Sequence, residues 1–187
     1  IETASCLKLN RDHMPSELTG GWYALGEDVT ITDRIKISGD VQLILTDGFT
    51  FNAKRGINLP ENSTLSIYGQ SGGTGILNAN SDGDTAIGGK YEESCGTLNV
   101  YGGTVIANPT KSDAAIGGGC STTGTGGNGG TVNVYGGKLT AGSSSSVAIG
   151  GGLSTTGTAG SVGQTFISGG SVSVYSKAMI AFDHVPT

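Results

Sequence analysis

Short runs in which apolar and polar residues alternate recur along the chain, separated by Gly, Asn, Asp and Ser. Alternation with a period of two is typical of β-strands that bury one face. The body of the chain lacks the apolar spacing of about 3.6 residues that predicts an amphipathic helix. The sequence therefore predicts an all-β fold built from short strands and tight turns.

These runs belong to a repeat. The segment TLNVYGG at 97–103 returns as TVNVYGG at 131–137, and TLSIYG at 64–69 is an earlier, weaker copy. Between these copies, Ala-Ile followed by glycines recurs at 86–89, 115–119 and 148–152. A period of this length indicates units that stack on one another. Stacked at the ~4.8 Å strand spacing, each unit pairs its backbone with the next, which predicts a parallel β-helix of about five coils with three short strands each.

The aliphatic positions of the runs are expected to point inward as ladders of like residues. The first strand of each coil contributes Leu65, Ile67, Leu98, Val100, Val132 and Val134. The second strand contributes Leu77, Ala79, Val105, Ala107, Leu139, Ala141, Val172 and Val174. The third strand contributes Ile87, Ile116, Ile149 and Ile180. This alignment predicts one continuous core along the stack.

The first 28 residues contain more charged and bulky side chains than the segments after them. A stack of strands leaves an open edge at each end, and an open edge invites aggregation unless something covers it. We therefore expect residues 1–28 to form an N-terminal cap with Trp22 in the core, and residues 29–187 to form the parallel β-helix. The chain begins without a methionine or a signal segment, so we expect further domains in the same polypeptide.

Composition and charge narrow the function classes. Of 187 residues, 35 are glycine, against ~7% in average proteins, and coils that turn sharply need such residues. The net charge of -5 argues against a nucleic-acid partner, because binding to phosphates requires a basic surface. No apolar run approaches the ~20 residues of a membrane span. We therefore expect neither nucleic-acid binding nor membrane insertion.

Several segments resemble a known family. They are GWY at 21–23, VTITDRI at 29–35, VQLILTDG at 41–48, IYGQSGG at 67–73 and the iterated AIGGG at 115–119 and 148–152. Together they resemble the Gly-rich β-helix repeat segments of large surface proteins from Gram-positive, gut-type bacteria. The resemblance implies a right-handed, pectate-lyase-like solenoid that is extracellular or attached to the cell wall, with a role in glycan contact or display. It brings no catalytic residue to this chain.

The outward positions of the first strands form the candidate binding site. A column of Ile44, Tyr68, Tyr101 and Tyr135 is expected beside Gln42, Ser66, Asn99 and Asn133. Pyranose rings offer C–H faces to aromatic rings and hydroxyls to amides, so we assign carbohydrate binding to Tyr68, Tyr101, Tyr135, Asn99 and Asn133. The alternative is that these side chains only stack on themselves, because cross-strand aromatic and amide pairs stabilise sheets by ~0.2–1 kcal/mol each.

Carboxylates are sparse where catalysis on a glycosidic bond would need them in pairs. Between Asp113 and Asp183 there is no Asp or Glu, so an active centre would have to lie near Asp47 or among the charged and tyrosine residues from Asp82 to Asp113, which include Asp84, Lys90, Tyr91, Glu92 and Glu93. Aligned third strands place Asp84 above Asp113, where the two could share Ca²⁺ or cap their own turns. We predict no catalytic residue, no metal site and no cofactor.

The remaining candidates are loop and terminal residues. The segment 90–95 is shorter and more charged than the corresponding loops of the later repeats. This difference reflects either neutral sequence drift or a function of the loop. Cys95 and Cys120 fall in corresponding loops and could form a disulfide that leaves Cys6 free. His13 and His184 lie in the terminal segments without triad partners and are interpreted as surface or cap residues.

These observations favour a non-catalytic carbohydrate-binding or adhesion module of a secreted or cell-surface bacterial protein, with a host or plant polysaccharide as its expected partner. Two alternatives stay open. One is a structural stalk or spacer domain, and the other is an enzyme of the polysaccharide lyase or glycosidase type acting through the Asp82 to Asp113 region.

Overall fold

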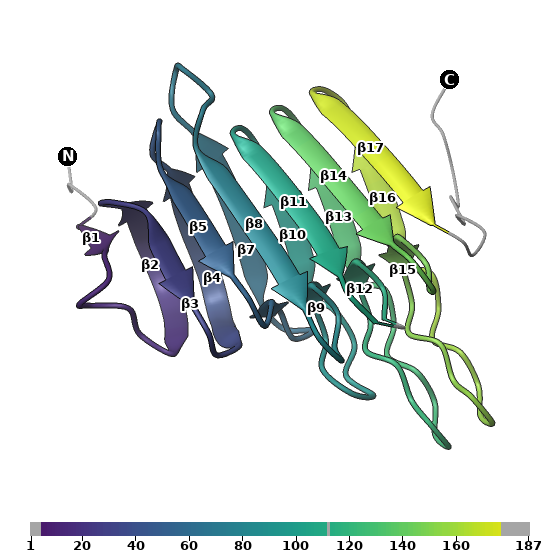
Figure 1. Ribbon diagram of the computed structural model, residues 1–187. Helices are drawn as coiled ribbons and strands as arrows, with labels where there is room; N and C mark the ends of the chain where they lie inside the picture. Colours follow the sequence, from purple (N-terminus) through teal and green to yellow (C-terminus); the bar gives the residue numbers. More distant parts are fainter. Residues whose placement is uncertain (1–4, 112, 177–187) are drawn as a thin grey trace.

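The computed structural model describes residues 5–111 and 113–176. Within these ranges every regular element is a β-strand and no helix is present. One sheet has eleven strands and the other has six among the described residues. Neighbouring strands run parallel throughout, which Figure 1 shows as arrows of one direction in each layer. This architecture is all-β and fits a parallel β-solenoid.

The strands line up in three columns, because each pairs with strands one repeat earlier and later in the sequence. The first column holds β1 (Cys6–Leu9), β7 (Thr64–Gly69), β10 (Thr97–Val100), β13 (Thr131–Val134) and β16 (Gln164–Ile167). The second holds β3 (Val29–Ile31), β5 (Thr50–Ala53), β8 (Ile76–Ser81), β11 (Thr104–Pro109), β14 (Lys138–Ser143) and β17 (Ser171–Ser176). The third holds β6 (Ile57–Asn58), β9 (Ile87–Gly88), β12 (Ile116–Gly117) and β15 (Ile149–Gly150).

Two longer strands join the first and third columns into the larger sheet. These are β2 (Glu17–Leu25) and β4 (Ile35–Leu45). The start of β4 pairs with β6 in the third column, and its end pairs with β7 in the first. The start and end of β2 pair with the corresponding parts of β4. The chain therefore bends within β2 and β4 without leaving the sheet.

The core consists of the predicted inward ladders. Leu65, Leu98 and Val132 are in register in the first column and fully buried. Equivalent buried ladders are Leu77, Val105 and Leu139 in the second column, and Ile87, Ile116 and Ile149 in the third. Burying each such side chain stabilises the fold by ~1.5–3 kcal/mol. The predicted register is confirmed for these ladders, while Ile180 lies outside the described residues.

The segment before residue 28 contributes strands to the same parallel sheet, since β1 pairs with β2 and β2 with β4. The expectation that Trp22 belongs to the core is wrong. Trp22 is in register with Gln42 on the outward side of the sheet, and its side chain is half-buried. Strand alternation instead sends Tyr23 inward, where it is buried and donates a hydrogen bond from its hydroxyl to the Thr19 carbonyl oxygen at 2.7 Å. The division of the chain at residue 28 stays a prediction.

Glycine pairs turn the chain from the first column into the second. Gly103 and Gly137 follow Tyr101 and Tyr135, and their φ angles are 76° and 71°. Side chains with a Cβ rarely adopt this left-handed region. The expected role of these glycines in the turns is confirmed. Because each turn directly follows a tyrosine, Tyr101 and Tyr135 are the last outward residues of their strands in the first column.

A half-buried arginine connects three repeats at the third column. The Arg34 guanidinium donates hydrogen bonds from Nη1 to the carbonyl oxygens of Arg55 at 3.0 Å and Thr85 at 2.6 Å. From Nη2 it donates to the carbonyl oxygens of Ile57 at 3.1 Å and Gly88 at 3.0 Å. Burial lowers the pKa of Arg34, although nearby acidic side chains act in the opposite direction. The guanidinium thus supplies hydrogen-bond donors to backbone carbonyl groups of successive repeats, one of which, that of Gly88, also accepts from the Leu59 N–H.

Candidate functional site

The outward face of the first column carries three parallel ladders of side chains. We define this outward face by nine residues of β7, β10, β13 and the positions directly after β10 and β13: Thr64, Ser66, Tyr68, Thr97, Asn99, Tyr101, Thr131, Asn133 and Tyr135. It forms because alternate residues of a strand point to the same side and the repeat places like residues on adjacent strands. All five predicted carbohydrate-binding residues lie on this face.

The tyrosines of the outward face stack directly on one another. The ring centroids of Tyr68 and Tyr101 are 4.8 Å apart with an interplanar angle of 6°. Those of Tyr101 and Tyr135 are 4.7 Å apart at 12°. Partial desolvation, followed by the two neighbouring tyrosines, raises the pKa of the Tyr101 hydroxyl. Tyr101 and Tyr135 are nevertheless 42% and 48% exposed, so their ring edges and hydroxyls face solvent.

Trp22 extends this aromatic column beyond the residues that sequence reasoning selected. Its ring centroid lies 5.2 Å from that of Tyr68, with an interplanar angle of 34°. Ile44, which was expected in the column, is in register with Tyr68 and is half-buried. At the other end, Ser168 follows Ile167 at the position equivalent to Tyr135. The alternation of residues in β2 was the signal that could have placed Trp22 outside.

The amides of the outward face bond to one another. Asn133 donates from Nδ2 to Asn99 Oδ1 at 2.8 Å, and Asn99 donates from Nδ2 to Ser66 Oγ at 3.1 Å. Gln42 is in register with Ser66 at one end of this ladder, and Phe166 is in register with Asn133 at the other. The ladder is therefore fixed in orientation before any ligand arrives. Pre-ordered polar groups lose little entropy on binding.

Stacking makes Tyr101 a contributor to stability as well as a candidate ligand contact. Replacing Tyr101 by alanine is expected to lower the free energy of unfolding by about 1–3 kcal/mol, because it removes two ring pairs that contribute ~0.5–1.5 kcal/mol each. Tyr101→Phe keeps both pairs and is expected to change stability by less than ~0.5 kcal/mol. Urea unfolding of both variants measures the difference. Equal losses would show that the hydroxyl, rather than stacking, stabilises the fold.

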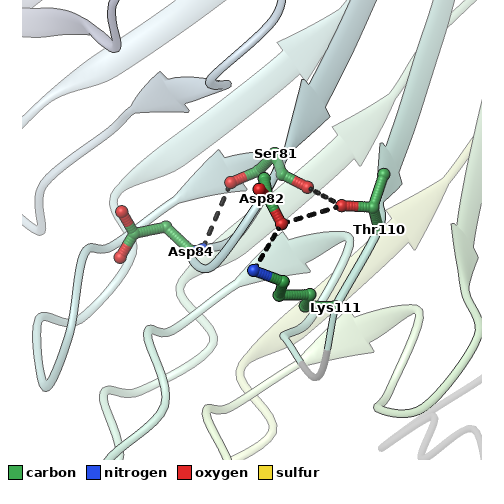
Figure 2. Close-up of polar contacts among 5 residues, drawn as sticks. All are labelled: Ser81, Asp82, Asp84, Thr110 and Lys111. Atoms are coloured by element: carbon green, nitrogen blue, oxygen red, sulfur yellow. Dashed lines mark hydrogen bonds and ion pairs between the residues drawn. The ribbon is translucent and has the colours of Figure 1, made fainter.

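The carboxylates near the second column have structural partners. Asp82 forms an ion pair with Lys111, with 2.8 Å between Oδ1 and Nζ, and accepts a hydrogen bond from Thr110 Oγ1 at 3.4 Å (Figure 2). The hydrogen bond and charge of Lys111 lower the pKa of Asp82. The backbone N–H of Asp84 donates to Ser81 Oγ at 3.2 Å, and its carboxylate points away from the ion pair. Asp82 is thus suited to remain ionised rather than to act as a proton donor.

The expected alignment of Asp84 with Asp113 agrees with the register of Ile87 on Ile116. Asp113 is buried, and its Oδ1 has no hydrogen-bond partner. Over residues 5–111 and 113–176, no group of three or more His, Cys, Asp and Glu side chains is placed to hold a metal ion. The calcium alternative therefore rests on two carboxylates alone.

The departing loop at 90–95 packs against the loop of the next repeat. Tyr91 accepts a hydrogen bond at its hydroxyl from the Thr122 N–H at 2.8 Å, and Glu92 Oε1 accepts one from Ser121 Oγ at 2.6 Å. Figure 1 shows these loops extending from the sheets side by side after β9, β12 and β15. The loop residues therefore connect neighbouring repeats, whether or not they also have a function.

The cysteines and the described histidine show no reactive arrangement. Cys6, Cys95 and Cys120 are free thiols, so the structure does not contain the disulfide considered for Cys95 and Cys120. Desolvation raises the pKa of the Cys95 and Cys120 thiols to about 12, and thiols are poor nucleophiles when protonated. His13 is exposed near the N-terminus, whereas His184 lies outside the described residues.

Comparisons with models of known families, with curated proteins and with solved structures found no significant match to this chain. Among the residues that the structure describes, no helix has the length and apolar character needed to cross a membrane.

Proposed function

We propose that the chain is a non-catalytic carbohydrate-binding or adhesion module of a bacterial protein that is extracellular or attached to the cell wall. In this proposal the described strands belong to a right-handed parallel β-helix of about five coils with an N-terminal cap. The outward face of the first column is the binding surface, and Tyr68, Tyr101, Tyr135, Asn99 and Asn133 make the contacts.

One observation carries this proposal: aromatic and amide side chains form adjacent, ordered ladders on an exposed sheet. Each step of the ladders is one strand spacing, with stacked rings 4.7 and 4.8 Å apart. A polysaccharide chain is also a regular repeat, and it offers hydroxyls to amides and C–H groups to aromatic edges. Because Tyr101 has a neighbouring ring on each face and Tyr135 has one on a single face, the sugars would contact mainly the edges and hydroxyls of Tyr101 and Tyr135.

Calorimetric titration with plant and mucin polysaccharides tests the proposal. We expect measurable binding by the wild type and at least a tenfold loss in the triple variant Tyr68→Ala, Tyr101→Ala and Tyr135→Ala. Tyr175→Ala is the matched control, because Tyr175 is exposed on β17 in the other sheet. No binding to any polysaccharide, or equal binding by the triple variant, would contradict the assignment.

A structural stalk is the second candidate, and the contacts within the outward face favour it. The tyrosines stack on each other and the amides bond to each other, which is what a stiff, self-supporting surface requires. A protein that binds no polysaccharide but loses stability in Tyr101→Ala would support this alternative. The enzymatic alternative has less support, since Asp82 is engaged by Lys111.

A further inference from the structure

Two adjoining grooves follow the corner between the loops and the start of the first-column strands. One has a volume of about 490 Å³ and is lined by residues that include Lys36, Asn62 and Glu93. The other has a volume of about 290 Å³ and is lined by residues that include Asn128 and Gln164. Both are lined by Glu61 and Ser94. Because they adjoin at these two residues, we treat them together and call them the corner groove.

The corner groove crosses the strands instead of following one of them. Part of its lining comes from the first residues of β10, β13 and β16, which are Thr97, Thr131 and Gln164 in register. Strands in a sheet are ~4.8 Å apart, so a linear ligand in the groove would meet a similar set of polar groups at each step. The groove therefore fits an extended polymer with a regular repeat.

One wall of the corner groove is a hydrogen-bonded ladder of loop residues. Asn128 donates from its backbone N–H to Ser94 Oγ at 3.1 Å. Ser161 donates from its backbone N–H and its Oγ to Asn128 Oδ1, both at 3.0 Å. These bonds fix the loops of three successive repeats relative to each other. Hydroxyl and amide groups held in this way suit the recognition of hydroxyl-rich ligands.

Charge in the corner groove selects against acidic ligands. Glu61 and Glu93 both line it, and within the described part of the chain no ion pair involves either carboxylate. Lys36 is the basic lining residue, and its Nζ pairs with Glu17 Oε1 at 3.0 Å. A polymer that carries carboxylates or sulfates would be repelled here.

We propose that the corner groove is a second binding site, which holds one extended chain of a neutral polysaccharide. The site is distinct from the tyrosines of the outward face. Tyr135 lies four positions after Thr131, directly beyond the end of β13, which corresponds to about 13 Å along an extended chain. The inference shares its ligand class with the proposed function, and Thr97 and Thr131 line the groove as well as belonging to the outward face. Neither is among the five side chains proposed to contact sugar on the outward face, so the two proposals can fail separately.

The test titrates neutral and uronic-acid oligosaccharides of equal length, such as cello-oligosaccharides and oligogalacturonides, into wild type and Thr131→Trp. We expect the wild type to bind the neutral chain at least tenfold more tightly than the acidic one. Thr131→Trp fills the groove at a half-exposed position and is expected to reduce neutral binding at least tenfold. Circular dichroism and the urea midpoint verify that the variant is folded.

Charge reversal tests the same site without blocking it. The double variant Glu61→Lys and Glu93→Lys is expected to bind the acidic chain at least tenfold more tightly than wild type at low salt, with the gain lost at high salt. Asp12→Lys with Asp33→Lys makes the same change in charge at exposed positions outside the groove lining and is expected to give no comparable gain.

The outcomes separate the two sites. Unchanged neutral binding in Thr131→Trp, tighter binding of the acidic chain by wild type, or equal gains in both charge-reversal variants would overturn the corner groove proposal. If the triple tyrosine variant then loses binding, the proposed function stands. If Thr131→Trp loses binding and the triple tyrosine variant does not, the corner groove stands and the tyrosine assignment fails.

Discussion

Replacing Gly117 by alanine is expected to lower the free energy of unfolding by about 3–5 kcal/mol. Gly117 in β12 has a φ of 144°, and forcing a residue with a Cβ into such a conformation costs ~1–3 kcal/mol. The added Cβ would also overlap the carbonyl oxygen of Gly150 in the next repeat, and overpacking of this kind costs a further ~1–3 kcal/mol or more. Urea unfolding followed by circular dichroism measures the loss.

Gly21→Ala is the matched control for this prediction. Gly21 has a similar φ of 141°, but an added Cβ would meet no atom within 4 Å. This variant is expected to lose only the conformational part, ~1–3 kcal/mol. The difference between the variants therefore measures how closely the backbones of successive repeats approach. Equal losses in the two variants would contradict the close stacking of β12 on β15.

Replacing Arg34 by methionine is expected to destabilise the protein by about 3–5 kcal/mol. Methionine keeps the apolar stem but removes the guanidinium, which takes this donor away from the carbonyl oxygens of Ile57 and Thr85. The Gly88 carbonyl oxygen still accepts a hydrogen bond from the Leu59 N–H. Each buried group left unsatisfied costs ~1–3 kcal/mol. The stability of Arg34→Lys is expected to lie between those of the wild type and Arg34→Met, because an ammonium lacks the planar fork of the guanidinium. Thermal and urea unfolding give the values.

Arg55→Met serves as the control for Arg34, because Arg55 is exposed and surface substitutions of this kind usually stay within ~0.5 kcal/mol. If Arg34→Met were as stable as Arg55→Met, the hydrogen bonds of the Arg34 guanidinium would not stabilise the third column. A stabilised Arg34→Met would instead show that desolvation of the charge outweighs its hydrogen bonds.

The alternating pattern was sufficient to predict strands, ladders and register. In a parallel stack, a shift of one residue would move Leu98 out of the core and Asn99 into it, so the pattern excludes that shift. The repeated sequence, which places like residues on like residues, selects the register among the shifts that remain. The same logic placed Tyr101 over Tyr68, as the ring stacking confirms. The repeat is sufficient to predict the strand register because each strand pairs with its own equivalent in the next repeat.

Features that depend on individual residues or on the lengths of loops were not predicted. Trp22 precedes the clear repeats, and its bulk suggested the core although alternation in β2 turns it outward. The burial of Arg34 depends on the space left by Gly56, where an added Cβ would meet the guanidinium and neighbouring carbonyl oxygens. The corner groove depends on loops whose lengths change between repeats. None of these follows from the period of the sequence.

The proposed function requires that a surface already satisfied by its own contacts still binds a ligand. The tyrosine rings and the amides of the outward face are held by their neighbours, so binding would draw on exposed edges, hydroxyls and remaining hydrogen-bonding capacity. Such binding is weak for each sugar and strengthens as a longer chain contacts more repeats. Longer oligosaccharides should therefore bind more tightly than short ones.

The most direct test is a two-dimensional amide NMR titration of the isotopically labelled protein with neutral oligosaccharides of increasing length. We expect shift changes at Tyr68, Tyr101 and Tyr135 and at the groove residues, with affinity that rises with chain length, while the outward residues of β8, β11 and β14 stay unchanged. Spectra that do not respond to any oligosaccharide, or shifts confined to the second column, would contradict this expectation.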